Sequence, residues 1–341
     1  MRKLKLFILI LIGALVGISL VGFAYQLTME QRDRVAYPAP GEIYQVGGID
    51  LHLDCRGQGT PTIILEAGLM SGSSSWMLVH DELAAVTRTC AYDRPGMDWS
   101  EPINRVADAE EVSERLYDLL VEAKIEGPKV LLGMSAGGIY VREYYKNHTD
   151  DIVGMVFVDS SHEQQGNRLP DVGDGGFFDA VLISCRLMQP IGLIRIFNVL
   201  DQFIVGPVLM VLGIELDEPT KNALLANMNQ SHSCASIYWE SESIEGEVRD
   251  EAPSNSLGDL PLVVLSQGEE PKASTQIGET LEQAMAQRKV WDELQLELLG
   301  LSSNGERFVA LESGHVIQFN QPELVVEKVS ELALQLRTSL P

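Results

Sequence analysis

The stretch "VLLGMSAGGIY", residues Val130 to Tyr140, places a serine among small residues where an apolar run ends. The pentapeptide "GMSAG" matches the pattern G-x-S-x-G, which in its catalytic context joins a strand to a helix. A sharp turn at that junction would expose the hydroxyl of Ser135, with Gly133 and Gly137 leaving room for crowded backbone. A serine also begins many helices without any catalytic role, so the rest of the chain has to separate the two interpretations.

Strands alternate with helices on both sides of this stretch. Continuous apolar runs, such as residues 61–68 and 129–134, are typical of strands buried on both faces. Segments such as 107–125 carry apolar side chains at helical spacing. The alternation predicts an α/β fold in which helices flank a mostly parallel central sheet. Residues 162–256 interrupt it and, being long and rich in Leu, Ile, Met and Phe, predict a helical insertion over the sheet's C-terminal edge.

Charge and cysteine spacing exclude several classes of function. Lys and Arg number 25 against 49 Asp and Glu, a formal net charge of −24. A surface this acidic repels phosphate backbones, so we expect no nucleic-acid partner. The four cysteines form no C-x-x-C pair, and the chemistry proposed below needs neither a metal nor an organic cofactor.

The N-terminus predicts a membrane anchor. "MRKLK" is followed by an uncharged run from Leu6 to Tyr25, about the 20 apolar residues that cross a bilayer core. Basic residues before the run favour a cytoplasmic N-terminus, with the main domain on the extracytoplasmic side. We therefore predict a single-pass anchor over 1–25 and a polar tether over 26–41. The alternative is a cleaved signal peptide and a secreted or periplasmic domain, although the run exceeds a usual signal h-region.

A serine hydroxyl becomes a good nucleophile only beside a positioned base. The chain has six histidines, of which His315 lies in "SGHVIQFNQPEL", after the final predicted strand and before the final helix. In an alternating α/β sheet this position is at the C-terminal edge, the edge from which Ser135 emerges. We predict that His315 is the general base.

The ordered segments "LEAGLMSGSSSW", "YDRPGMDWS", "GMSAGG" and "SGHVIQFNQPELV" resemble the α/β-hydrolase superfamily, in its serine-hydrolase, esterase- and lipase-like branch. The resemblance covers about residues 42–339. It implies a hydrolase core in two parts, 42–161 and 257–341, with 162–256 as the cap. It also implies that Ser135 is the nucleophile, His315 the base, and the backbone N–H groups of Leu69 and Ala136 the oxyanion hole.

The resemblance also implies an acidic residue that orients the histidine and completes a Ser-His-acid triad, and more than one residue could be this acid. The commonest family position follows "PLVVLSQG", where this chain has Glu269 and Glu270 but Pro271 in the slot of the usual aspartate. Asp159, at the end of "VFVDS", occupies a position that some relatives use. We predict Asp159, with Glu269 or Glu270 as the alternative acid.

Several residues depart from the family pattern or have other expected roles. Many relatives have His at Met134 and Gly at Asp98. Asp93 and Arg94 are expected to brace their loop. Cysteines on strands that would be neighbours suggest a Cys55–Cys90 disulfide, and a second, Cys185–Cys234, is suggested inside the cap. The alternative is that all four cysteines are buried and reduced.

The predicted function is a membrane-anchored serine hydrolase that cleaves a small, hydrophobic carboxylic ester or related acyl compound through an acyl-enzyme. One alternative keeps the triad but performs acyl transfer, amide or thioester cleavage, or a lyase reaction, because a fold does not settle chemistry. The other is a catalytically impaired hydrolase fold that serves as a binding protein.

Overall fold

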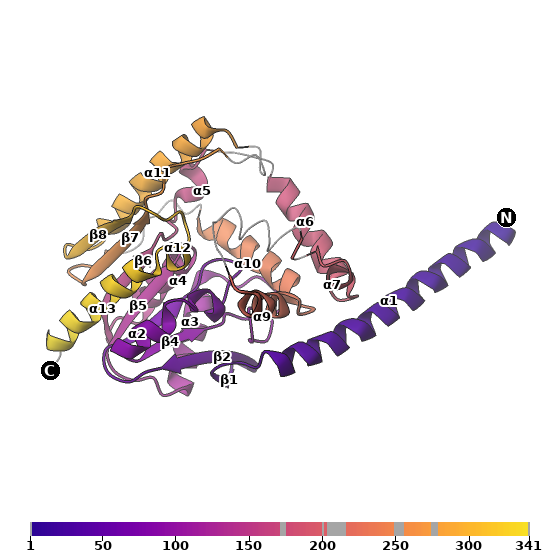
Figure 1. The fold of residues 1–341 in the computed structure, drawn as a ribbon, viewed down its shortest axis with the longest axis horizontal. Helices are drawn as coiled ribbons and strands as arrows, with labels where there is room; N and C mark the ends of the chain where they lie inside the picture. Colours follow the sequence, from indigo (N-terminus) through magenta and orange to yellow (C-terminus); the bar gives the residue numbers. More distant parts are fainter. Residues whose placement is uncertain are drawn as a thin grey trace.

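An eight-stranded sheet forms the centre of the molecule in the computed structural model, which describes residues 2–170, 175–199, 201–202, 216–248, 256–273 and 279–339 (Figure 1). The strand order is β1-β2-β4-β3-β5-β6-β7-β8. The β1–β2 and β2–β4 pairs are antiparallel and the other pairs are parallel, which confirms the predicted fold class. The strands are β1 Glu42–Val46, β2 Ile49–Arg56, β3 Thr62–Glu66, β4 Thr89–Tyr92, β5 Lys129–Met134, β6 Ile152–Val158, β7 Leu262–Gln267 and β8 Gly305–Ala310.

The central strands are apolar along their whole length because helices cover both faces of the sheet. In β3, Ile63 and Leu65 pack into the core on one face, whereas Ile64 packs into the core on the other. Successive strand side chains point to opposite faces, so a doubly covered strand needs no polar alternation.

The two faces are covered by different helices. Leu83 of α2 and Val329 of α13 contribute to one core, and Leu116 of α3, Val141 of α4 and Leu298 of α11 contribute to the other. The helices of the core are α2 His80–Val86, α3 Ala109–Glu122, α4 Gly137–Asn147, α11 Leu281–Leu299, α12 Ile317–Asn320 and α13 Pro322–Ser339, together with the short 3-10 turn Ser73–Trp76.

Helices also fill the described part of the predicted insertion. They lie between β6 and β7 in the chain; in Figure 1, α5 lies beside α11, and the other four lie between the sheet and the N-terminal helix. The rest of the predicted range 162–256 lies outside the described residues, and its boundaries as a cap stay a prediction. The helices are α5 Gln165–Arg168, α6 Gly175–Met188, α7 Leu193–Ile196, α9 Glu218–Met228 and α10 Ser233–Glu247.

Both suggested disulfides are present. Cys55 of β2 pairs with Cys90 of β4, at a position where the two residues face each other in the strand register. Cys185 of α6 pairs with Cys234 of α10 and lies in a small apolar cluster with the buried Ile194. The second bond therefore ties together two helices of the insertion.

The N-terminal helix is longer than the predicted anchor. Helix α1 runs from Arg2 to Ala36, so most of the predicted tether, 26–41, is helical and the helix ends shortly before Pro38. Within the described residues, α1 is the one helix long and apolar enough to cross a membrane. The residues after Tyr25 are polar, but the helix continues through them because Gln and Glu are good helix formers. The change in composition therefore indicates a change of environment along one continuous helix.

The polar part of α1 docks on the insertion and is no free tether. The Gln26 side chain donates a hydrogen bond to the Asn229 carbonyl at 2.6 Å, and the backbone N–H of Ser231 donates to a Glu30 carboxylate oxygen at 2.5 Å. Gln26 and Glu30 are 1% and 6% exposed. Buried polar groups with such partners fix the angle at which the helix leaves the domain.

Candidate active site

Ser135 lies in a tight turn between the end of β5 and the start of α4. Its φ is 50°, a left-handed conformation that costs energy for a residue with a Cβ. The glycines around it are required by crowding: a Cβ on Gly133 would lie 2.6 Å from the Gly137 carbonyl oxygen, and one on Gly137 would lie 2.5 Å from that of Glu66. The turn therefore has the geometry that the G-x-S-x-G pattern predicts.

The ring of His315 lies directly beside this serine. Its Nε2 is 3.0 Å from the Ser135 Oγ, although 180 residues separate the two in the chain. His315 follows β8 and precedes α12, and its side chain is 35% exposed. The indole of Trp291 packs edge-on against it, with ring centroids 5.6 Å apart. The ring is therefore packed against Trp291 and partly exposed.

Asp159 lies on the other side of the imidazole. One of its carboxylate oxygens is 2.7 Å from His315 Nδ1. Its other oxygen accepts hydrogen bonds from the Gln267 backbone N–H at 2.9 Å and from the Trp291 indole at 3.0 Å. The side chain is fully buried, and these hydrogen bonds fix its orientation.

The alternative acids lie elsewhere. Glu269 is exposed and pairs with Lys272, and Glu270 is also exposed. Among the described residues, the carboxylate that accepts a hydrogen bond from His315 Nδ1 is that of Asp159 and not that of either glutamate. The structure thus brings together Ser135, His315 and Asp159.

The predicted oxyanion donors are Leu69 and Ala136. Ala136 follows Ser135 at the start of α4. Leu69 follows Gly68, and Gly68 lies against the nucleophile turn: a Cβ there would be 2.6 Å from the Met134 sulfur and 3.3 Å from the Ser135 Cβ. Close approach of this loop to the serine is what an oxyanion hole requires.

Arg94 braces this loop from below, as expected of the "YDRPG" segment. Its buried guanidinium donates to the carbonyl oxygens of Ala67 at 2.9 Å, Gly68 at 2.6 Å and Ser71 at 3.2 Å. It also pairs with the carboxylate of Glu66 at 2.5 Å. Burial lowers the pKa of Arg94, but the carboxylates around it more than offset this and raise that pKa well above its ordinary value. The cation therefore stays charged while it holds the loop.

Glu240 joins the insertion to the same loop, and sequence reasoning missed it. One oxygen of Glu240, on α10, accepts the backbone N–H of Met70 at 2.6 Å, and the other accepts from Arg94 Nε at 2.6 Å. Met70 is the residue directly after Leu69. No motif marks Glu240, which is one of many acids in an acidic chain. Trp291 was also missed, because in the sequence it looks like one more apolar residue of a helix.

The residues that depart from the family pattern have structural contacts. The Met134 side chain is buried in the core. Asp98 has φ 36° and accepts the Ser74 backbone N–H at 3.0 Å, with the Asn227 amide at 3.4 Å. Burial, and then the nearby Asp93, raise the pKa of Asp98 to about 6.

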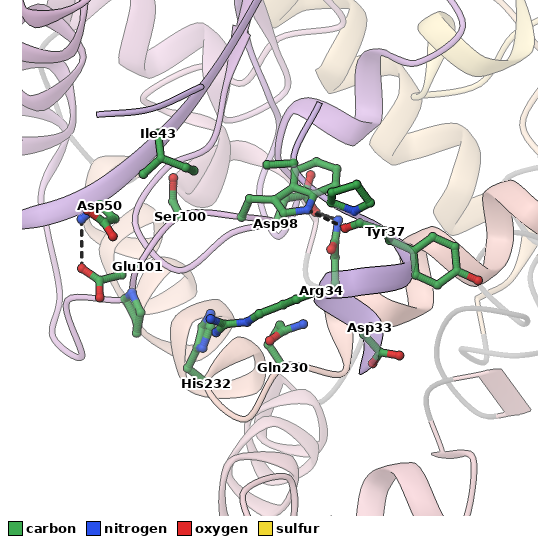
Figure 2. Close-up of a pocket in the computed structure, with 15 residues that line it drawn as sticks. Asp33, Arg34, Tyr37, Ile43, Asp50, Asp98, Ser100, Glu101, Gln230 and His232 are labelled. Carbon is green, nitrogen blue, oxygen red and sulfur yellow. Dashed lines mark hydrogen bonds between the residues drawn. The ribbon is translucent and has the colours of Figure 1, made fainter. Parts of the chain in front are cut away.

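A cavity of about 420 Å³ lies next to Asp98, between the end of α1, the loop after β4 and the insertion (Figure 2). In Figure 2, Arg34 of α1 extends toward His232 of the insertion. Burial lowers the pKa of His232. The lining does not include Ser135, His315 or Asp159, so this cavity is separate from the candidate active site.

Residues 63–328 match the alpha/beta hydrolase family. The chain belongs to this family. The match spans both parts of the sheet and the segment between them, so the predicted resemblance is confirmed for fold and family.

Two curated relatives extend the comparison. An uncharacterized protein of Schizosaccharomyces pombe is 27% identical over 299 residues, which are 75% of this chain and 52% of that protein. An uncharacterized vacuolar membrane protein of Saccharomyces cerevisiae is 33% identical over 108 residues, 30% of this chain and 17% of that protein. The chain thus spans about half the length of the first relative and less of the second.

Solved structures that are similar to this chain include proteins described as hydrolases. A putative lipase from Acinetobacter baumannii has a TM-score of 0.63 at 16% identity, covering 92% of this chain and 97% of the lipase. A thermophilic esterase from Thermogutta terrifontis has a TM-score of 0.55 at 16% identity, covering 87% and 98%. At these identities the likeness shows the fold.

Proposed function

We propose that this α/β hydrolase is a serine hydrolase that cleaves carboxylic esters through an acyl-enzyme. The observation that carries the proposal is the chain of contacts from Ser135 Oγ to His315 Nε2 at 3.0 Å and from His315 Nδ1 to Asp159 at 2.7 Å. The three residues have the relative order and the contacts of a nucleophile, a base and an orienting acid.

In the first half-reaction, Ser135 Oγ attacks the carbonyl carbon while its proton passes to His315 Nε2. The oxyanion that forms accepts the N–H groups of Leu69 and Ala136. The imidazolium then donates its proton to the leaving alkoxide, and the C–O bond to that group breaks. The Asp159 carboxylate stabilises the imidazolium and holds the Nδ1–H tautomer.

In the second half-reaction, His315 takes a proton from water, and the resulting hydroxide equivalent attacks the acyl-enzyme carbonyl. Collapse of this second tetrahedral intermediate returns the proton to Ser135 and releases the carboxylic acid. No group beyond the protein and water takes part.

The surroundings of the serine support a hydrophobic acyl group. Ala136 belongs to an apolar cluster with Ile139, and Ile244 and Val248 of the insertion also contribute to it, with Leu69 packed against it. Both proposed oxyanion residues therefore adjoin apolar side chains, and a buried apolar acyl chain would gain about 0.8 kcal/mol for each methylene removed from water.

We further propose that α1 anchors the enzyme in a membrane, with one span and the domain on the extracytoplasmic side. The large apolar side chains in the uncharged run of α1 are exposed, with the run buried only at Gly22, the basic residues precede it, and the Saccharomyces cerevisiae relative is described as a membrane protein. Two disulfides suit an oxidising compartment on that side.

The test is covalent labelling of the full-length protein with a fluorophosphonate, followed by turnover of matched esters, thioesters and anilides. We expect strong labelling that Ser135→Ala and His315→Ala abolish. Ser303→Ala and His148→Ala, which alter a serine and a histidine at the surface, serve as matched controls and keep full labelling. Labelling that persists in Ser135→Ala would assign the nucleophile to another residue, and turnover confined to anilides or thioesters would replace the ester assignment.

A further inference from the structure

Two consecutive helices of the insertion, α6 and α7, expose large apolar side chains. On α6, Ile183 and Leu187 are 46% and 70% exposed; just beyond, Ile196 at the end of α7 and the following Phe197 are 51% and 65% exposed. We call these four residues the α6–α7 patch. Neighbouring residues of the same elements are buried, among them Leu182, Cys185 and Ile194, so each element has one face in the core and one in the open.

The patch lies beside the place where α1 changes from apolar to polar. The backbone of α1 meets the turn between α6 and α7 directly: a Cβ on Gly22 would lie 2.2 Å from the Ile191 carbonyl oxygen, and one on Gly192 would lie 3.0 Å from the Gly22 oxygen. Closer to the C-terminal end of α1, Asp33 pairs with Arg195 at 2.6 Å. Figure 1 shows α7 close to the middle of α1, with α6 leading away from it.

This contact fixes the height of the patch relative to a bilayer. The uncharged run from Leu6 to Tyr25 rises about 30 Å as a helix, which matches the hydrocarbon core. Gly22 is close to the C-terminal end of that run. If α1 spans a membrane, the turn that touches Gly22 is therefore at the level of the bilayer surface.

The chain segment that carries the patch differs in charge from the rest of the protein. Residues 180–199 contain two arginines, Arg186 and Arg195, and no aspartate or glutamate, in a chain with 49 acids and 25 bases. Arginine and large apolar side chains, without acids, are the usual residues of an interfacial element.

We propose that the α6–α7 patch is a second membrane contact, seated in the interfacial layer of the same bilayer that α1 crosses. The inference rests on the proposed anchoring by α1 and adds that the insertion lies against the lipid surface. The occupant of the patch is lipid and not a second protein chain, because the patch continues the membrane surface defined by α1. Apolar substrates dissolved in the bilayer would then reach the insertion without first crossing bulk water.

The proposal is tested with the full-length protein in vesicles of phosphatidylcholine containing a minor share of phosphatidylglycerol. All four native cysteines are paired in disulfides, so one introduced cysteine can carry a bimane fluorophore. Leu187→Cys and Phe197→Cys report the patch, and Leu11→Cys reports the middle of the proposed span. Leu334→Cys, on α13 and 47% exposed, is the matched control far from the patch. The vesicles carry nitroxide lipids labelled either near the headgroup or deep in the chain.

We expect bimane at 187 and 197 to be quenched by the shallow nitroxide, bimane at 11 by the deep one, and bimane at 334 by neither. Unquenched labels at 187 and 197 beside a quenched label at 11 would overturn the patch and leave the anchor intact. Labels at 187 and 197 shielded from aqueous iodide yet unquenched by lipid would assign the patch to a second protein copy. An unquenched label at 11 would overturn both the anchor and the patch. Fluorophosphonate labelling of the same samples reports the proposed hydrolase chemistry separately from all of these.

Discussion

The two halves of the candidate site are held by different parts of the molecule. On the proton-transfer side, Asp159 is fixed by Gln267 of β7 and Trp291 of α11, all within the hydrolase core. On the oxyanion side, the loop after β3 is held by Arg94 of the core and by Glu240 of the insertion. The core can therefore assemble the proton relay alone, whereas the alignment of the oxyanion loop depends on where the insertion sits.

The largest expected effect concerns the core half. Asp159→Asn removes the negative charge beside His315 and presents a donor to Nδ1, which favours the wrong imidazole tautomer. We expect the rate constant of ester hydrolysis to fall by about 10⁴-fold. The measurement is kcat on a chromogenic ester; Glu269→Gln is the matched control and should stay at the parent rate. A large loss in Glu269→Gln would move the acid to that residue.

Glu240→Gln tests the insertion half. The amide can accept from only one of the two donors that Glu240 now serves, Met70 N–H and Arg94. Hydrogen bonds to charged groups contribute about 1.5–3 kcal/mol, so if their loss appears in the transition state, kcat falls about 10- to 100-fold.

Two readouts separate alignment from general damage in that variant. KM should change little, and the pH profile of kcat should keep its shape, since the proton relay is untouched. Glu242→Gln, an exposed acid on the same helix, is the control. Equal losses in both variants would mean that α10 acts through stability alone and that the two halves do not differ.

A smaller effect is expected from Trp291→Phe. This change removes one hydrogen bond to Asp159 but leaves the Gln267 N–H in place and keeps an aromatic ring beside His315. A neutral hydrogen-bond partner contributes about 1 kcal/mol, so we expect kcat to fall by about fivefold, with Trp291→Leu lower still because the ring packing is also lost. An unchanged kcat in Trp291→Phe would leave the backbone of β7 as the sufficient support of the acid.

The smallest expected effect concerns folding stability at Asp98, which lies where the core contacts the insertion. The pKa of Asp98 is raised from 3.8 to about 6 in the folded protein, so the folded state binds more protons than the unfolded state between those values. Folding stability from this residue is therefore present at low pH and is lost as the pH rises toward 6. The shift sets an upper limit of about 3 kcal/mol, and because the side chain is partly exposed we expect about 1 kcal/mol.

Asp98→Asn should remove this pH dependence. Chemical denaturation at pH 5 and pH 7 should show the variant equal to the parent or weaker at the lower pH and relatively more stable at the higher one. A parent-like pH dependence in Asp98→Asn would assign the effect to another group.

The parts of the site foreseen from sequence are those fixed by local chain geometry. A glycine-flanked serine after a buried strand, and a histidine and an aspartate after other parallel strands, meet because the C-terminal ends of those strands share one edge. Ser135 and His315 could therefore be chosen from their places along the chain, whereas for the acid the same reasoning favoured Asp159 but left Glu269 and Glu270 as alternatives. The same holds for the alternation that predicted the sheet.

The parts that were missed depend on pairing between distant elements. Glu240 and Trp291 lie on helices whose sequence shows only which face is apolar, and nothing local states which loop or carboxylate they reach. The docking of Gln26 and Glu30 was hidden in the same way, since polar residues after an apolar run look like a solvated linker until their buried partners are known.

If α1 anchors the protein in a membrane, as proposed, its docking on the insertion limits how the domain could be released. Trimming the chain back to the first strand would strip away the residues that satisfy Asn229, Ser231 and Arg195 in the insertion. A released form would need to keep the chain from about Gly22 onward. Otherwise these polar groups would lose their partners, in the same insertion that carries Glu240. The same few turns of α1 would therefore both connect the domain to the membrane and complete the contacts of the insertion, so cleavage within them would also alter the structure of the domain.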